Sequence, residues 1–189
     1  MVTDILSTEC LELYNRCKNY DVISIDIFDT SLIRLVDRPE VIFEVVGKKL
    51  NLRDFAASRI NAQLAAEVKI GVKTTIQDIY RELIQHGYLD RSAAQTAMEL
   101  ETETEKRMCV ARKDLIDFVR DMKVEGKEIV FLSDMYLPGK ILTEILTDKG
   151  FRNFDRVIVS CDYGKNKISG EAFRYLKSLY PKRRIIHIG

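Results

Sequence analysis

The sequence predicts an α/β protein with a parallel sheet and an all-helical insertion after its first strand. Three observations support this fold class. Residues 21–28 form a β-branched, apolar run that is typical of a buried strand. From Asp114 onward, helical and strand patterns alternate, which favours βαβ units with right-handed crossovers. Between the first two strands, roughly a hundred residues show helical periodicity without a strand pattern.

Each element of the parallel unit has its own signal. A helix is expected over residues 3–18 from its apolar spacing, and the first strand follows over residues 21–28. Further strands are predicted at residues 128–133, 156–160 and 185–188. Gly126 and Gly150 stand where a glycine commonly ends the preceding helix, because glycine adopts left-handed backbone angles easily.

The insertion reads as four helices, at residues 39–50, 53–69, 75–86 and 92–108. Pro39 suits a first helical turn, Thr75 with Asp78 forms a capping-box pattern, and Gly87 suits a helix end. Apolar spacing predicts that the following side chains face inward: Ile60, Leu64, Val68, Ile76, Ile79, Tyr80 and Leu83. A helical insertion at this point predicts a lid over the carboxyl ends of the strands.

Composition excludes several classes of protein. The 189 residues carry 30 Lys+Arg and 29 Asp+Glu, so the net charge is only +1 and both signs are interleaved. No basic stripe for nucleic acid is present, and no apolar run approaches the ~18 residues of a membrane span. Four cysteines without a C-x-x-C spacing argue against a zinc knuckle. We expect a cytoplasmic protein that binds neither nucleic acid nor membrane.

Polar residues follow the first two strands at the points where they end. The first strand leads into Asp26-Ile27-Phe28-Asp29-Thr30. Because ligands of parallel sheets bind at the carboxyl ends of strands, Asp26 is a candidate nucleophile, metal ligand or both. The alternative is a carboxylate that only caps a turn.

The next strands deliver groups suited to a phosphate. Ser133 and Asp134 end the second strand and offer a hydroxyl and a backbone N–H to a phosphate oxygen. The loop after the third strand contains Lys165 and Lys167, and an ammonium near a carboxylate nucleophile would offset the charge of an incoming phosphate. A solvated surface lysine is the alternative for each.

The order of these residues resembles the haloacid dehalogenase-like (HAD) superfamily, whose members are mostly phosphatases with a Rossmann-like core and a mobile cap. Asp26 matches the nucleophile of the first motif and Thr30 its downstream threonine. Ser133 matches the second motif, and Lys167 matches the third-motif lysine better than Lys165 does. The resemblance covers the whole chain. It implies a core at residues 1–34 and 111–189, with a helical cap at residues 35–110.

The resemblance also implies a chemistry. The expected reaction is Mg²⁺-dependent hydrolysis or transfer of a phosphoryl group through an aspartyl-phosphate on Asp26. Thr30, Ser133, Asp134 and Lys167 would bind the phosphate, and Mg²⁺ would be held by Asp26 and the Phe28 carbonyl. The wording of residues 24–30 and 133–138 is similar to a subgroup of predicted HAD hydrolases found beside glycosyltransferases. The substrate expected from this association is a small phosphorylated metabolite such as a sugar phosphate.

Two departures from the family pattern keep alternatives open. Phe28 stands where HAD phosphatases usually have a general acid, and Asp29 is the nearest replacement. The chain stops at Gly189, where the family would next supply an acidic metal ligand. One alternative is a 2-haloacid dehalogenase, since those members also place an aromatic residue at the position of Phe28. Another is a non-catalytic binding domain, or the leading part of a longer glycosyltransferase-linked protein. We expect a partner chain or a following domain to cover the edge formed by Ile185–Ile188.

The remaining polar residues favour structural roles. The glutamates at 99, 101, 103 and 105 alternate by two, which predicts charges spread over a solvated helix surface. Arg34 could bind an anionic substrate group, but a surface role is favoured. His86 and His187 are isolated, which argues against a histidine-based triad.

Overall fold

The structure is a computed structural model that describes residues 8–189. Its main sheet contains β1 (Val22–Asp26), β4 (Glu128–Ser133), β5 (Arg156–Val159) and β6 (Ile185–Ile188) in the order β5-β4-β1-β6. All three pairings are parallel, as the sequence predicts. The helix predicted at residues 3–18 is described from Thr8 as α1 (Thr8–Cys17), and its first five residues lie outside the described residues.

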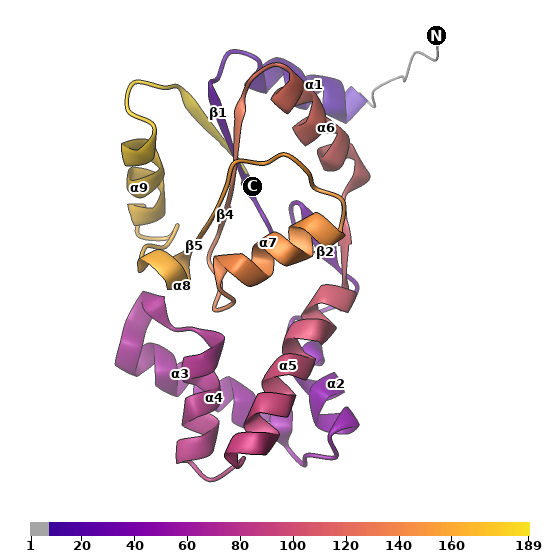
Figure 1. Cartoon of the computed structure of the whole chain (residues 1–189), viewed down its shortest axis with the longest axis vertical. Helices are drawn as coiled ribbons and strands as arrows, with labels where there is room; N and C mark the ends of the chain where they lie inside the picture. The colour runs from indigo at the N-terminus through magenta and orange to yellow at the C-terminus, as the bar shows by residue number, and fades with distance from the viewer. Residues whose placement is uncertain (1–7) are drawn as a thin grey trace.

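The parallel register brings the carboxyl ends of the strands to one edge of the sheet. Asp26 of β1 pairs with Leu132 of β4, so Asp26 and Ser133 end neighbouring strands. Ile25 pairs with Ile188, which places the end of β6 on the other side of β1. In Figure 1 these strand ends point toward the helical part of the molecule. The residues of β6 are half-buried at the sheet edge, and a partner covering this edge stays a prediction.

Helices cover both faces of the sheet. Successive strand residues point to opposite faces, and both faces carry apolar side chains that are buried by helices. The remaining helices of this unit are α6 (Lys113–Val124), α7 (Gly139–Asp148), α8 (Ser160–Tyr163) and α9 (Glu171–Leu179). One face packs against α9 through a small apolar cluster that includes Leu132, Ile158 and Leu176. The opposite face belongs to the main core, which includes Ile23, Phe131 and residues of α6 and α7. No helix within residues 8–189 is long and apolar enough to cross a membrane.

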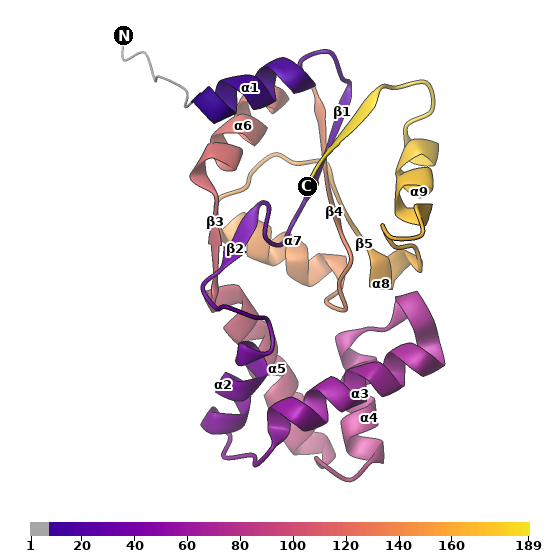
Figure 2. The same ribbon diagram turned by 180° about the vertical axis from the view of Figure 1, so that it is seen from behind.

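The insertion forms a separate layer, which we call the helical lobe (residues 41–107; Figure 2). It contains α2 (Val41–Lys49), α3 (Phe55–Ile70), the 3₁₀ turn η1 (Gly71–Lys73), α4 (Ile76–Gln85) and α5 (Arg91–Arg107). Two short antiparallel strands, β2 (Leu32–Arg34) and β3 (Cys109–Ala111), connect it to the sheet. The expectation of helices alone between the first two sheet strands is therefore wrong at both junctions.

Local sequence signals explain where α4 begins and which face of it is buried, but they fail for the buried face of α3. The capping box is confirmed, because Thr75 accepts from the Asp78 N–H and the Asp78 carboxylate accepts from the Thr75 N–H. Ile79 of α4 is buried as expected. Leu64 and Val68, however, are 55% and 88% exposed, so their predicted inward orientation is wrong. The buried residues of α3 are instead Phe55, Ser58, Arg59, Ala62 and Ala66.

The core of the helical lobe contains an ion pair. Arg59 on α3 and Glu101 on α5 have side chains that are 0% and 1% exposed, and both nitrogen–oxygen contacts between them measure 2.8 Å. Tyr80 donates a third hydrogen bond to Glu101 at 2.8 Å. The prediction of a solvated glutamate series is wrong for Glu101 and Glu105, which are four residues apart and therefore share one buried helix face.

A loop of the sheet unit reaches into this lobe. Tyr136 follows β4, and its ring lies 4.8 Å from the Arg59 guanidinium carbon. The Tyr136 carbonyl accepts a 2.9 Å hydrogen bond from the Ile76 N–H, the first residue of α4. An ion pair between Lys106 and Asp148 joins the two layers at the surface. The lobe is therefore attached to the strand that carries Ser133 as well as through the β2–β3 ribbon.

Candidate active site

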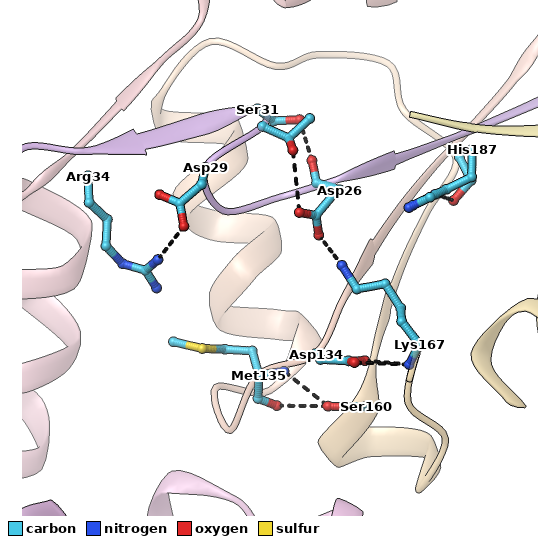
Figure 3. Close-up of polar contacts among 11 residues, drawn as sticks. Asp26, Asp29, Ser31, Arg34, Asp134, Met135, Ser160, Lys167 and His187 are labelled. Carbon is cyan, nitrogen blue, oxygen red and sulfur yellow. Dashed lines mark hydrogen bonds and ion pairs between the residues drawn. The ribbon is translucent and has the colours of Figure 1, made fainter. Parts of the chain in front are cut away.

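Asp26 and Lys167 form the centre of the candidate active site. The Lys167 ammonium lies 2.5 Å from Oδ1 of Asp26, and the two residues are 141 positions apart in the chain. Their side chains are 25% and 19% exposed for Lys167 and Asp26, so the pair is neither buried nor fully solvated. Figure 3 shows the ammonium directed at the carboxylate. Lys165, the competing lysine, instead lies 5.6 Å from the Tyr175 ring.

The turn after β1 contacts both the backbone and the side chain of Asp26. Ser31 donates a 2.6 Å hydrogen bond to the Asp26 carbonyl, and Thr30 donates a longer one, 3.4 Å, to Asp26 Oδ2. Asp29 has a φ of 59°, a left-handed conformation that an aspartate tolerates better than most residues. Ser31 is a supporting residue that sequence reasoning missed, because nothing in the pattern distinguishes it from other turn residues.

The loop after β4 holds the backbone of Lys167. Both carboxylate oxygens of Asp134 accept from the Lys167 N–H, at 3.1 and 2.9 Å. Ser160 accepts a 3.0 Å hydrogen bond from the Met135 N–H and so ties the same loop to the end of β5. Ser133 is 3% exposed, and its hydroxyl forms no hydrogen bond within residues 8–189. The Ser133 hydroxyl is thus available to a ligand.

Asp29 and Phe28 contact Arg34 and not the Asp26–Lys167 pair. The Asp29 carboxylate is 75% exposed and faces Arg34, with a nitrogen–oxygen distance of 3.5 Å (Figure 3). The Phe28 ring is 9% exposed, and the Arg34 guanidinium carbon lies 3.9 Å from its centroid. The position that the family resemblance gives to a general acid therefore carries an aromatic ring covered by a cation.

His187 on β6 borders the same site. Its Nδ1 lies 3.0 Å from the hydroxyl of Ser24, and its ring packs edge-on against Phe173. Burial lowers the pKa of His187, and the Lys167 ammonium lowers it further, while the Asp26 carboxylate opposes both effects. These surroundings therefore favour the neutral form of the imidazole. Its isolation in the sequence gave no signal of this neighbourhood.

A cleft of about 710 Å³ runs between the helical lobe and the strand ends. Asp134 belongs to its wall, and Asn166 and Ile168 belong to it on either side of Lys167. Asp26 and Lys167 do not themselves line the cleft, but the residues on either side of Lys167 do, which places the cleft next to the ion pair. The lobe contributes mainly apolar side chains and the acidic Glu67, and Glu40 adds a second carboxylate just before α2; the apolar residues are Phe43, Ile60, Leu64 and Val72.

The oxygen donors at the site suit a magnesium ion shared with a substrate. Asp26 offers a carboxylate, and the Phe28 carbonyl accepts no hydrogen bond from the described residues. No group of three or more His, Cys, Asp or Glu side chains that could hold a metal occurs within residues 8–189. Mg²⁺ fits such a sparse donor set, because it commonly binds one or two carboxylates and completes its shell with water and phosphate oxygens.

Comparisons with known proteins identify similar folds. No protein-family model and no curated protein matches the sequence. The structure is similar to a predicted phosphoglycolate phosphatase from Haemophilus somnus, with a TM-score of 0.55 and 15% identity over 90% of this chain and 77% of that one. It is also similar to an L-2-haloacid dehalogenase (TM-score 0.52, 14% identity, 89% and 77% covered). A third similar structure is a HAD-family enzyme from Bacteroides thetaiotaomicron (TM-score 0.53, 13% identity, 85% and 78% covered).

Proposed function

We propose that this chain, which has the fold of the HAD hydrolases, hydrolyses or transfers a phosphoryl group through an aspartyl-phosphate on Asp26. The observation that carries the proposal is the Asp26–Lys167 ion pair at the end of β1, one of the two inner strands of the sheet. A carboxylate at a partly open sheet edge can act as a nucleophile. The neighbouring ammonium would offset the negative charge of an incoming phosphate. The proposed substrate is a small phosphorylated metabolite, for which sugar phosphates are the first candidates.

The geometry assigns a role to each group. Lys167 holds Oδ1 of Asp26, so Oδ2 is the oxygen expected to attack phosphorus in line. The bond between phosphorus and the leaving oxygen breaks as the acyl phosphate forms. Water then attacks phosphorus, which releases phosphate and restores the carboxylate. Lys167 and the Ser133 hydroxyl would hold phosphate oxygens, and Asp134 would position Lys167 through its backbone N–H.

Mg²⁺ held by the Asp26 carboxylate and the Phe28 carbonyl would supply positive charge that offsets the charge of the bound phosphate. Protonation of the leaving oxygen has no obvious donor at residue 28. Asp29 is the nearest carboxyl group, but its ion pair with Arg34 directs it elsewhere. We therefore expect faster turnover of phosphate esters whose leaving groups need little protonation, such as aryl phosphates.

The insertion is proposed as a lid. The division into a core at residues 1–34 and 111–189 and a cap at residues 35–110 is supported by the β2–β3 ribbon, which lies at both junctions. The cleft between the lobe and the strand ends supports the same role. A lid at this position would exclude water from the acyl phosphate and select the substrate.

A direct test is phosphate release from a panel of aryl phosphates, sugar phosphates and other phosphorylated metabolites, with Mg²⁺ and with EDTA. We expect Mg²⁺-dependent release and loss of activity in Asp26→Asn. Full activity in Asp26→Asn would contradict the role of Asp26. If the intact protein releases phosphate from no compound, the non-catalytic binding domain becomes the better assignment.

One observation favours a second candidate activity. The aromatic ring of Phe28 replaces the acid that phosphatases use, and carbon–halogen hydrolysis by Asp26 needs neither that acid nor a metal. Chloride release from 2-haloacids in the presence of EDTA would identify this activity. Phosphate release that disappears with EDTA would exclude it as the main reaction.

A further inference from the structure

Arg34 is the strongest feature of the site that the proposed mechanism leaves unused. It ends β2, and its side chain is 9% exposed. Among the described residues it is the only cationic side chain in the wall of the cleft. Glu40, Glu67 and Asp134 contribute negative charge to the same wall. A negatively charged group in the cleft is therefore favoured beside Arg34 and disfavoured beside the three acidic residues.

The guanidinium of Arg34 is only partly hydrogen-bonded. Its Nε donates to Oε1 of Glu105 at 2.8 Å, and the Glu105 side chain is 2% exposed. Burial raises the pKa of Glu105, although Arg34 opposes this effect. The terminal nitrogens form no hydrogen bond within residues 8–189, and the only ion pair there is the 3.5 Å contact with Asp29. Within the described part of the chain, the two-nitrogen end of this largely buried arginine thus has only the long ion pair with Asp29 as a polar contact.

A purely structural role does not require this arrangement. Glu105 is already paired through Nε, so the terminal nitrogens add little to its neutralisation. The Asp29 carboxylate is mostly exposed, and solvent screening makes such a contact weak and easily displaced. The planar end of a guanidinium matches the two oxygens of a carboxylate or a phosphate, which is why arginine recognises both.

We propose that Arg34 binds a second anionic group of the substrate, displacing Asp29. This inference rests on the proposed phosphatase function. Preferred substrates would be phosphate monoesters whose organic part carries a carboxylate or another phosphate. The esterified phosphate would sit at Asp26 and Lys167, while the second anion would lie on the two terminal nitrogens of Arg34.

Matched substrates test the proposal. Propyl phosphate serves as the reference; 3-phosphooxypropanoate replaces its terminal methyl by a carboxylate, and propane-1,3-diyl bisphosphate adds a phosphate. The intact protein should prefer at least one anionic ester over propyl phosphate by roughly tenfold or more in kcat/KM, and the two anionic esters distinguish the two chemistries. Equal kcat/KM for all three esters would overturn the proposal while leaving the phosphatase function intact.

Variants at Arg34 provide the specific test. Arg34→Lys keeps a cation beside Glu105 but loses the two-nitrogen end, and we expect the preference ratio to fall toward one. Arg34→Gln combined with Glu105→Gln removes both charges and leaves no unpaired carboxylate to unfold the lobe, and the same fall is expected. Glu105→Gln alone should keep the preference. An unchanged ratio in Arg34→Lys would overturn the proposal.

Binding separates this inference from the phosphatase function. Calorimetry of the same three esters with Asp26→Asn measures affinity without turnover. Tighter binding of an anionic ester, lost in Asp26→Asn/Arg34→Lys, would support Arg34 even if the intact protein showed no phosphatase activity. Equal affinity of all three esters for Asp26→Asn would overturn the inference whatever the turnover results.

Discussion

Two ion pairs of this molecule each join a basic side chain to a carboxylate, but their surroundings differ. Arg59–Glu101 lies inside the helical lobe, with side chains that are 0% and 1% exposed. Lys167–Asp26 lies at the sheet edge, with side chains that are 25% and 19% exposed. The first is enclosed within one layer, whereas the second borders a cleft between two layers.

The difference lies in how completely each pair is satisfied. Arg59 uses two nitrogens on Glu101 and a third on Gln63, and it packs against the rings of Phe43 and Tyr136. Burial by itself would lower the pKa of Arg59, but the Glu101 carboxylate raises it overall. Asp26 Oδ2, by contrast, accepts only the long 3.4 Å hydrogen bond from Thr30 among the described residues. We infer that an ion pair whose hydrogen-bonding groups all have partners stabilises the fold. An ion pair with an oxygen left for a ligand is available for chemistry.

The largest expected effect is on the saturated pair. Arg59→Met leaves the Glu101 carboxylate buried without its cation, which typically costs about 3–5 kcal/mol of unfolding free energy. Urea denaturation measures this loss. Replacing both partners, Arg59→Met with Glu101→Leu, should recover most of it because neither charge of this pair remains. If the single and double variants were equally unstable, the pair would not be acting through its charge.

The open pair should show the reverse behaviour. Lys167→Ala is expected to reduce kcat by about 10²–10³, comparable to the loss of one donor in an oxyanion hole. Its unfolding free energy should change by less than about 1 kcal/mol, since partly exposed ion pairs contribute little. Lys165→Ala, two residues away, is the matched control and should retain activity. A large loss of stability in Lys167→Ala would remove the distinction between the two pairs.

A smaller effect is expected from one hydrogen bond of the saturated pair. Tyr80→Phe removes the hydroxyl that donates to Glu101, which should cost about 1.5–3 kcal/mol because the acceptor is charged and buried. Tyr88→Phe is the control, since Tyr88 is 57% exposed. Equal melting temperatures for the two variants would show that the remaining partners of Glu101, Arg59 and Tyr136, satisfy its carboxylate without Tyr80.

The smallest expected effect is a pH dependence from His187. Its pKa is lowered in the folded protein, so the unfolded chain takes up a proton first as the pH falls below about 6.5. His187 therefore stabilises the fold above that pH, and this contribution decreases as the pH falls toward its folded pKa. His187→Gln should make urea stability less dependent on pH between about 5 and 7. An identical pH profile in His187→Gln and the unmodified protein would contradict this assignment.

The predictable parts of the fold were those encoded by local pattern. The strand at residues 128–133 combines an apolar run with Gly126 before it, and the structure has the same bounds. The three-residue strands β2 and β3 were missed because such short segments carry no clear alternation. Their pairing is a long-range contact between residues 34 and 109 that no local signal reports.

The candidate site was predictable only in part. Asp26 and Ser133 follow from strand ends, but choosing Lys167 over Lys165 depended on a family resemblance. The surroundings of Arg34 could not be predicted, since its partner Glu105 lies 71 residues away. The burial of Glu101 and Glu105 is hidden in the sequence because their spacing of four lies within a series that alternates by two, which spreads charge around a helix.

The β2–β3 ribbon has a consequence for how this protein can change over evolutionary time. Arg34 is paired with Cys109, so the two ends of the insertion lie side by side. For the sheet unit, the insertion is therefore equivalent to a loop whose ends are already joined. Doubling the length of such a loop adds only about 0.6 kcal/mol of closure entropy. The insertion can therefore lengthen, shorten or be exchanged with little penalty to the sheet, so substrate selection can diversify while Asp26 and Lys167 stay in place.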